Sequence, residues 1–236
     1  MTPLSRNARV AGLLYILASA VAIVRLLYIP KALFVHGNAA ATASNLVAHE
    51  SLFRMGIVCY LVGGTLWLFV PLALYRLLKG VDQTLAVMMV ILGSLMQVPT
   101  YFFNTVTDVA ALRFARGGAD FLSVIDKPQR EALALLSLNL HHQLDLANMM
   151  FAGLWLLPFG LLVYKSRFLP RFLGVWLMAA SVPYVAICVS GFLQPGSEDR
   201  IFSLGQPLML GEVATMLWLV VMGAKDRSGA ARQEIV

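Results

Sequence analysis

Residues 55–75 read MGIVCYLVGGTLWLFVPLALY, and this stretch decides the class of fold. It holds no charged side chain, and a helix of this length rises about 30 Å, the thickness of the hydrocarbon layer of a membrane. Backbone N–H and C=O groups in lipid must be paired inside the segment unless a barrel closes, and the alternating pattern of a barrel strand is absent. The stretch therefore predicts a transmembrane helix.

Apolar blocks of similar length recur along the whole chain. The predicted spans cover residues 10–30, 55–75, 84–106, 144–164, 171–193 and 203–223. The first block contains Ala18-Ser19-Ala20, which resembles a signal-peptide cleavage site, but its apolar run continues to Ile29, so we expect it to remain as a span. The sequence thus predicts an all-α fold, a bundle of six transmembrane helices in one membrane domain over residues 1–236.

The composition agrees with a membrane protein and excludes several other classes. Hydrophobic residues make up 59% of the chain and charged residues 13%, with a mean hydropathy of +0.78. Soluble chains carry about 25% charged residues, so a soluble enzyme, a disordered tail and a disulfide scaffold are excluded. The net charge of +6 comes from basic residues at the ends of apolar blocks, which indicates topology and no nucleic-acid partner. Cys59 and Cys188 lie in separate apolar segments and form no C-x-x-C motif.

The distribution of basic residues predicts the orientation. One set of helix ends has a net charge of +7, and the rest of the chain has −1. The charged residues at the positive ends are Arg6, Arg9, Arg76, Lys79, Lys165, Arg167, Arg171, Lys225, Arg227, Arg232, Asp82, Asp226 and Glu234. Positive ends face the cytoplasm, so both termini should be cytoplasmic. The outer connections are longer: we expect a short helix after Gly37-Asn38 between helices 1 and 2, and a turn at residues 116–118 between long extensions of helices 3 and 4.

Polar side chains gather in the outer half of the predicted bundle. Two of the helices carry polar stripes at helical spacing: Gln97, Tyr101, Asn104 and Asp108 on helix 3, and Ser137, His141, Asp145 and Asn148 on helix 4. These helices run in opposite directions, so the two stripes should meet at similar depth. Ionisable groups inside a bilayer are costly and usually mark a functional site. Glu212 is the deepest acid, and Arg25 is its expected partner.

Each of these features also has a structural explanation. An ion pair between Glu212 and Arg25 that only locks two helices together explains both residues as well as a functional role does. His141, His142 and Asp145 could form half of a metal site, with His49 and Glu50 from the outer loop completing it. Because a third ligand is uncertain, we favour the interpretation that these are solvated polar side chains where a helix begins at the membrane interface. We therefore predict no metal. No cofactor is predicted either: every lysine lies outside the spanning cores, which excludes a retinal Schiff base, and the histidines lie too near the outer interface for haem.

Three segments resemble a known family: Asn7–Tyr15, Asn45–Arg54 and Leu72–Leu78. They are similar to the bacterial integral-membrane family called domain of unknown function 4386. The resemblance covers nearly the whole chain and implies a multi-helix protein of the bacterial inner membrane. It implies no activity, so it assigns no functional residue, but it nominates the outer loop with Glu50, Phe53 and Arg54. Members often have an acid after the loop glycine, where this chain has Asn38.

Two functional hypotheses follow, and a purely structural membrane subunit is a third. The first is binding or transport of a small amphiphile or lipid in a polar pocket open to the outer leaflet, above an apolar floor with Trp67, Trp155 and Trp218. Its candidate binding residues are Arg25, Arg54, Asn104, Asp108 and Glu212. The second is an intramembrane enzyme acting on a lipid or isoprenoid, with Glu212 or Asp145 as general acid/base and His142 as partner. The expected partners are membrane lipids and a small amphiphile, and the oligomeric state stays open.

Overall fold

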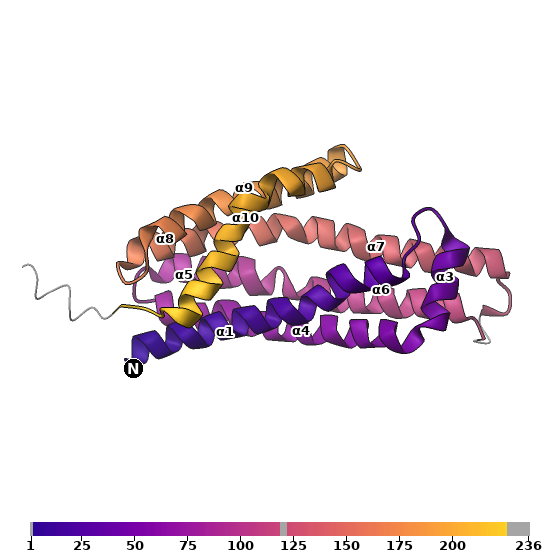
Figure 1. Cartoon of the computed structure of the whole chain (residues 1–236), viewed down its shortest axis with the longest axis horizontal. Helices are drawn as coiled ribbons and strands as arrows, with labels where there is room; N and C mark the ends of the chain where they lie inside the picture. The colour runs from indigo at the N-terminus through magenta and orange to yellow at the C-terminus, as the bar shows by residue number, and fades with distance from the viewer. Residues whose placement is uncertain (1, 119–121, 226–236) are drawn as a thin grey trace, which may run out of the picture. The chain divides into compact units, whose positions relative to one another are not determined.

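The computed structural model describes residues 2–118 and 122–225, and these residues form helices and no strand (Figure 1). The helical elements are α1 (Pro3–Ile23), η1 (Val24–Tyr28), α2 (Ile29–Leu33), α3 (Ala39–Ala48), α4 (Glu50–Leu78), α5 (Gln83–Val90), η2 (Ile91–Leu95), α6 (Val98–Arg116), α7 (Lys127–Leu154), α8 (Leu156–Ser166), α9 (Arg171–Leu193) and α10 (Glu198–Val221). The all-α prediction is confirmed.

Within the described residues, six helical segments are long and apolar enough to cross a membrane, as the sequence predicted. The fifth predicted span, residues 171–193, coincides with α9. The third and fourth spans extend beyond the predicted ends, because α6 continues to Arg116 and α7 begins at Lys127. The turn after Arg116 contains Gly117 and Gly118 at φ +66° and +79°, a conformation that favours glycine.

Two π-helical segments interrupt the spans, and each precedes a proline. η1 ends two residues before Pro30, and η2 ends four residues before Pro99. Proline has no N–H and its ring clashes with the carbonyl one turn earlier, so the regular hydrogen-bond ladder fails there. At η2 the side chain of Gln97 replaces part of the ladder by donating to the carbonyl of Leu92 at 3.1 Å. The π-turns therefore have an identifiable local cause.

The predicted short outer helix is present as α3. Asn38 caps it, since its side-chain oxygen accepts from the N–H of Ala41 at 2.9 Å. The preceding loop is held by the side chain of Asn45, which donates to the carbonyl of Leu33 at 3.0 Å. Thr42 also accepts from the N–H of Val35 at 3.0 Å. These bonds fix the loop before α3 against the helix.

The described chain divides into two compact units. Unit 1 comprises Met1–Leu17, Leu66–Gln97 and Leu146–Val236, and unit 2 comprises Ala18–Thr65 and Val98–Asp145. Because α1, α4 and α7 each supply residues to both units, the division falls within continuous helices. The single membrane domain expected from the sequence stays a prediction.

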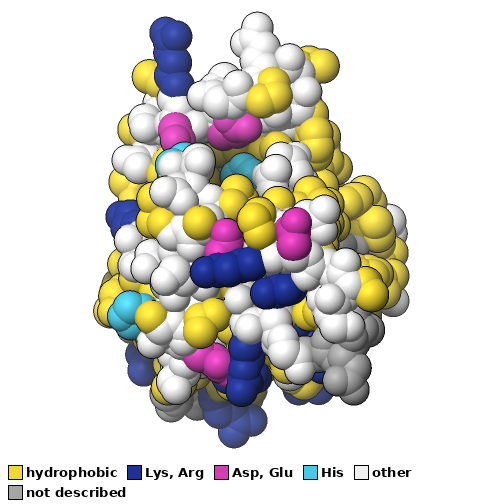
Figure 2. Space-filling model, turned by 90° about the vertical axis from the view of Figure 1, so that its right-hand side faces the viewer, with side chains coloured by type: hydrophobic (Ala, Val, Ile, Leu, Met, Phe, Trp, Pro, Cys, Tyr) yellow, Lys and Arg dark blue, Asp and Glu magenta, His cyan; other side chains and the backbone are white. Residues whose placement is uncertain are grey.

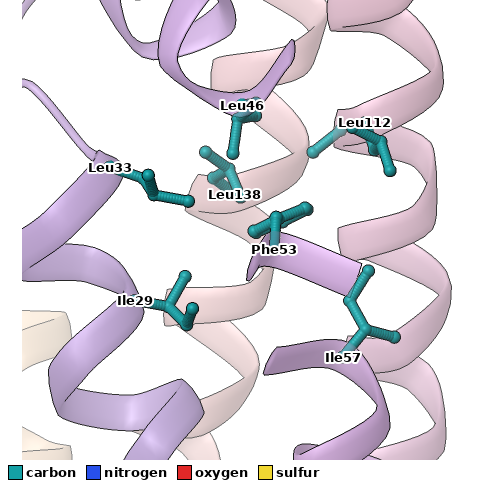
Figure 3. Close-up of a cluster of buried hydrophobic side chains, with 8 residues drawn as sticks. Ile29, Leu33, Leu46, Phe53, Ile57, Leu112 and Leu138 are labelled. Carbon is teal, nitrogen blue, oxygen red and sulfur yellow. The ribbon is translucent and has the colours of Figure 1, made fainter. Parts of the chain in front are cut away.

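Unit 2 has an apolar cluster that joins α2, α3, α4, α6 and α7. Figure 3 shows its side chains converging from these helices. The buried members are Ile29, Leu33, Leu46, Phe53, Ile57, Ala111, Leu112 and Leu138. Phe53 is fully buried among them, and it belongs to the loop segment that the family resemblance nominated. Its position shows a packing role for that residue.

Unit 1 packs through aromatic rings and glycines. Tyr15 lies 5.3 Å from the ring of Trp67 and 5.8 Å from that of Trp155, measured between centroids. Gly160 and Gly174 bring α8 and α9 together, since a Cβ on either would lie 2.6 Å from the other's carbonyl oxygen.

At one end of the unit, Asp82 caps α5. The N–H of Leu85 and the ammonium of Lys165 hold the pKa of that carboxyl below its ordinary value.

Candidate functional site

Unit 2 contains a buried ion pair between Arg25 of η1 and Asp108 of α6. Arg25 Nε donates to Asp108 Oδ2 at 2.7 Å, and Arg25 Nη2 donates to Oδ1 at 2.5 Å. The side chains are 3% and 0% exposed. Two parallel bonds between a guanidinium and a carboxylate give strength and fixed geometry. The rings of Phe34 and Phe53 lie 5.6 and 5.9 Å from Arg25 Cζ, which adds cation–π contacts.

His141 of α7 connects this ion pair to a second carboxylate. Its Nδ1 lies 3.0 Å from Asp108 Oδ1 and 3.2 Å from Arg25 Nη2. Its Nε2 lies 3.2 Å from Asp145 Oδ2 but is not aligned for a hydrogen bond. Nδ1 can accept a bond from Arg25 or, when protonated, donate one to Asp108. The imidazole therefore stands between two acids.

Asp145 lies at the far side of His141 and has two donors of its own. Its Oδ1 accepts from the hydroxyl of Tyr60 and from Asn104 Nδ2, each at 2.7 Å. The ring of Tyr101 lies 4.8 Å from that of Tyr60. Asp145 remains 19% exposed, whereas Asn104 and Asp108 are fully buried. Asp145 is therefore the accessible edge of the network.

The polar stripes predicted from helical spacing do meet. Asn104 and Asp108 of α6 face Asp145 and His141 of α7, as the opposite directions of the two helices implied. Gly64 of α4 makes room beside them, because a Cβ there would lie 2.5 Å from the ring of Tyr101. We call the set Arg25, Tyr60, Asn104, Asp108, His141 and Asp145 the polar network.

The network holds unsatisfied groups and an uneven charge. Asn104 Oδ1 and His141 Nε2 are buried and have no hydrogen-bond partner among the described residues. With His141 neutral, one arginine faces two aspartates, which leaves one negative charge in excess. Buried polar atoms without partners are rare, and an ordered water, an ion or a catalytic role can account for them. The arrangement can accept a proton, a cation or a hydrogen-bond donor.

The expected partnership of Glu212 with Arg25 is wrong. Arg25 pairs with Asp108, whereas Glu212 belongs to unit 1. There its Oε2 accepts from the hydroxyl of Tyr184 at 2.8 Å, and its Oε1 accepts from that of Tyr15. Glu212 has no ion-pair partner within residues 2–118 and 122–225. The sequence indicates the depth of a residue along its helix, but depth does not identify the helix that it faces.

Several other candidates lie outside the network. His142 is exposed, so the place beside Asp145 expected for it belongs to His141. Arg54 is 57% exposed and pairs with Glu50 at 2.7 Å, and Glu50 also lies 3.4 Å from Arg116. On the face shown in Figure 2, acidic and basic side chains lie beside one another among apolar ones.

The proposed metal ligands are not assembled. His49 contacts the carbonyl of Asn45 through Nδ1 at 3.2 Å, and Glu50 is engaged by arginines. Among the residues that the structure describes, no three or more His, Cys, Asp or Glu side chains are placed to hold one metal ion. The half-site of His141 and Asp145 is instead part of the polar network.

Comparison with known proteins assigns the family. The model of a family described as "Domain of unknown function (DUF4386)" matches residues 10–223. The chain belongs to this family. An uncharacterized protein of Archaeoglobus fulgidus is 35% identical over 82 residues, which cover 35% of this chain and 47% of that protein. The chain thus matches about half the length of that relative. No solved structure matches the chain. With its six apolar spans, the chain is a multi-pass membrane protein.

Proposed function

We propose that the protein binds a small amphiphile in the membrane and carries it across, with the polar network as the site for its polar end. The proposal places the protein in the bacterial cytoplasmic membrane with both termini in the cytoplasm. One observation carries it: the buried network holds polar atoms without hydrogen-bond partners, and with His141 neutral it has one negative charge in excess. A ligand that donates hydrogen bonds and carries positive charge would satisfy both.

The exposure gradient supports a direction of approach. Arg25 and Asp108 compensate each other inside, and Asp145 alone of the acids is partly exposed. A cationic head that reaches Asp145 would leave the inner pair intact. Its apolar tail would then remain among the apolar surfaces of the spans. This modifies the sequence hypothesis, in which Arg25, Arg54 and Glu212 orient the polar end.

The test compares three amphiphiles of equal chain length, dodecylammonium, dodecanol and dodecanoate. Binding to the full chain in nonionic detergent is measured by equilibrium dialysis. We expect dodecylammonium to bind best, and Asp145→Asn to weaken it about tenfold or more, since a hydrogen bond to a charged group contributes about 1.5–3 kcal/mol. Asp82→Asn is the control, because Asp82 lies outside the network. Equal binding of the three compounds, or no effect of Asp145→Asn, would refute the proposal and favour a structural subunit.

A second candidate function is an intramembrane enzyme acting on a lipid or isoprenoid. The observation that favours it is the position of His141 between Asp108 and Asp145, since a histidine beside carboxylates can move a proton during a reaction. Incubation of the purified protein with a lipid extract, followed by mass spectrometry, tests it. Turnover that disappears in His141→Asn, while dodecylammonium binding persists, would support catalysis over binding.

A further inference from the structure

Unit 1 holds two neighbouring cavities that share one basic residue. The larger cavity measures about 760 Å³ and is lined by Tyr75 and Arg76 of α4, by Lys79 in the turn after α4, by Gln83 of α5, and by Thr2 with the first residues of α1. The smaller measures about 220 Å³. Its lining includes Arg76 and the apolar side chains Val10, Leu14, Phe69, Leu72 and Ala73 of α1 and α4. Arg76 therefore stands where a basic cavity meets an apolar one.

The larger cavity has a positive charge that none of its described lining residues cancels. Arg76 and Lys79 are exposed, and no Asp or Glu is among the described residues that line either cavity. Lys79 Nζ lies 5.8 Å from the ring centre of Tyr75, which positions the ammonium at the cavity. Asp82, the nearest acid in sequence, is occupied by Lys165 at 3.1 Å. An anion in this cavity would meet Arg76 and Lys79, for which the described residues supply no ion-pair partner.

The smaller cavity requires an apolar occupant. It runs along one side of α1 and α4 in the segment that the sequence predicts to lie in lipid. A free phosphate would fill only the basic cavity, and a plain hydrocarbon would fill only the apolar one. A molecule that satisfies both carries an anionic group next to a hydrocarbon chain. Anionic lipids are attracted to clustered basic residues at helix ends.

We propose that the two cavities together bind one anionic phospholipid. Its phosphate lies between Arg76 and Lys79, and one acyl chain lies along Val10, Leu14 and Phe69. The lipid comes from the leaflet that faces the positive helix ends. This site belongs to unit 1 and takes an anion, so it stands or falls independently of the cation site proposed for the polar network.

The headgroup half of the site is tested by charge removal. Native mass spectrometry of the full chain, titrated with phosphatidylglycerol or phosphatidylcholine of the same chains, gives the affinities. We expect the wild type to prefer phosphatidylglycerol, and Arg76→Gln and Lys79→Gln each to lower that affinity about fivefold. Arg171→Gln is the matched control: Arg171 is exposed and its Cζ lies 5.6 Å from the ring of Tyr164, yet it lines neither cavity.

The acyl half is tested by filling the smaller cavity. Ala73→Trp should lower the affinity for phosphatidylglycerol and leave that for glycerol phosphate, the headgroup without chains, unchanged. Leu217→Trp is the control, because Leu217 is 52% exposed and lines neither cavity. The proposal would be overturned if the wild type bound phosphatidylglycerol and phosphatidylcholine with equal affinity. It would also be overturned if Arg171→Gln lowered the affinity for phosphatidylglycerol as much as Arg76→Gln does. Binding of glycerol phosphate as tight as that of the lipid would show a phosphate site without a lipid.

Discussion

At the residue scale, the pair of Arg25 and Asp108 should be the most sensitive part of unit 2. Removing one partner leaves a charge buried without its counterpart, which costs about 3–5 kcal/mol in proteins. Arg25→Gln and Asp108→Asn should therefore each lower the free energy of unfolding in detergent by about that amount. The double variant should lose clearly less than the sum, because it strands no charge. Additive losses in denaturant titrations would show that the two residues act separately.

Glu212 has a different environment, so the stability of its variants should depend on the hydrogen bonds that each variant keeps. Tyr15 and Tyr184 donate to its carboxylate. Glu212→Gln keeps the shape and an acceptor oxygen and should cost little stability. Glu212→Leu leaves the hydroxyls of buried Tyr15 and half-buried Tyr184 unpaired, at about 1–3 kcal/mol for a buried group. Thermal unfolding in detergent compares the two variants, and an equal loss in both would mean that the negative charge itself is required.

The residues of the network show which parts of a site a sequence can predict. Asn104, Asp108, His141 and Asp145 were predictable because helical spacing alone puts each pair on one face. The choice between His141 and His142 was not, since neighbours on a helix point about 100° apart and both fit an interfacial helix start. Tyr60 was missed because tyrosines near the ends of spans are typical interfacial anchors.

At the element scale, the spans were predictable because length and hydropathy decide them, whereas the π-turns were not. Hydropathy does not report which carbonyl an N–H bonds. Prolines do give a signal, and Pro30 and Pro99 each follow a π-segment. η1 carries Arg25, so the irregular turn sets the direction of the guanidinium that the network uses. In other proteins, π-turns occur frequently at functional sites.

The contact between α8 and α9 gives a prediction for this scale. Gly160→Ala and Gly174→Ala should each destabilise unit 1 by about 1–3 kcal/mol, because the added methyl meets backbone that cannot move aside. Gly80→Ala is the control, since nothing lies within 4 Å of a Cβ there. Thermal unfolding in detergent measures all three. A loss for Gly80→Ala as large as for the other two would mean that the α8–α9 contact is not what the glycines protect.

At the scale of the whole molecule, the number of spans and the distribution of charge together predict the topology. Six crossings would place both termini on one side, and the basic helix ends predict that this side is the cytoplasm. Single cysteines at exposed positions His36, Gly80 and Gln194, in a chain with Cys59 and Cys188 replaced by serine, test this in intact cells. A membrane-impermeant maleimide should label the variants at residues 36 and 194 directly, and the variant at residue 80 only after permeabilisation. The opposite labelling pattern would mean that the orientation is reversed and that the polar network lies on the cytoplasmic side. Labelling of residues 36 and 80 from the same side would contradict a crossing by α4, the helix whose apolar run first indicated a membrane protein.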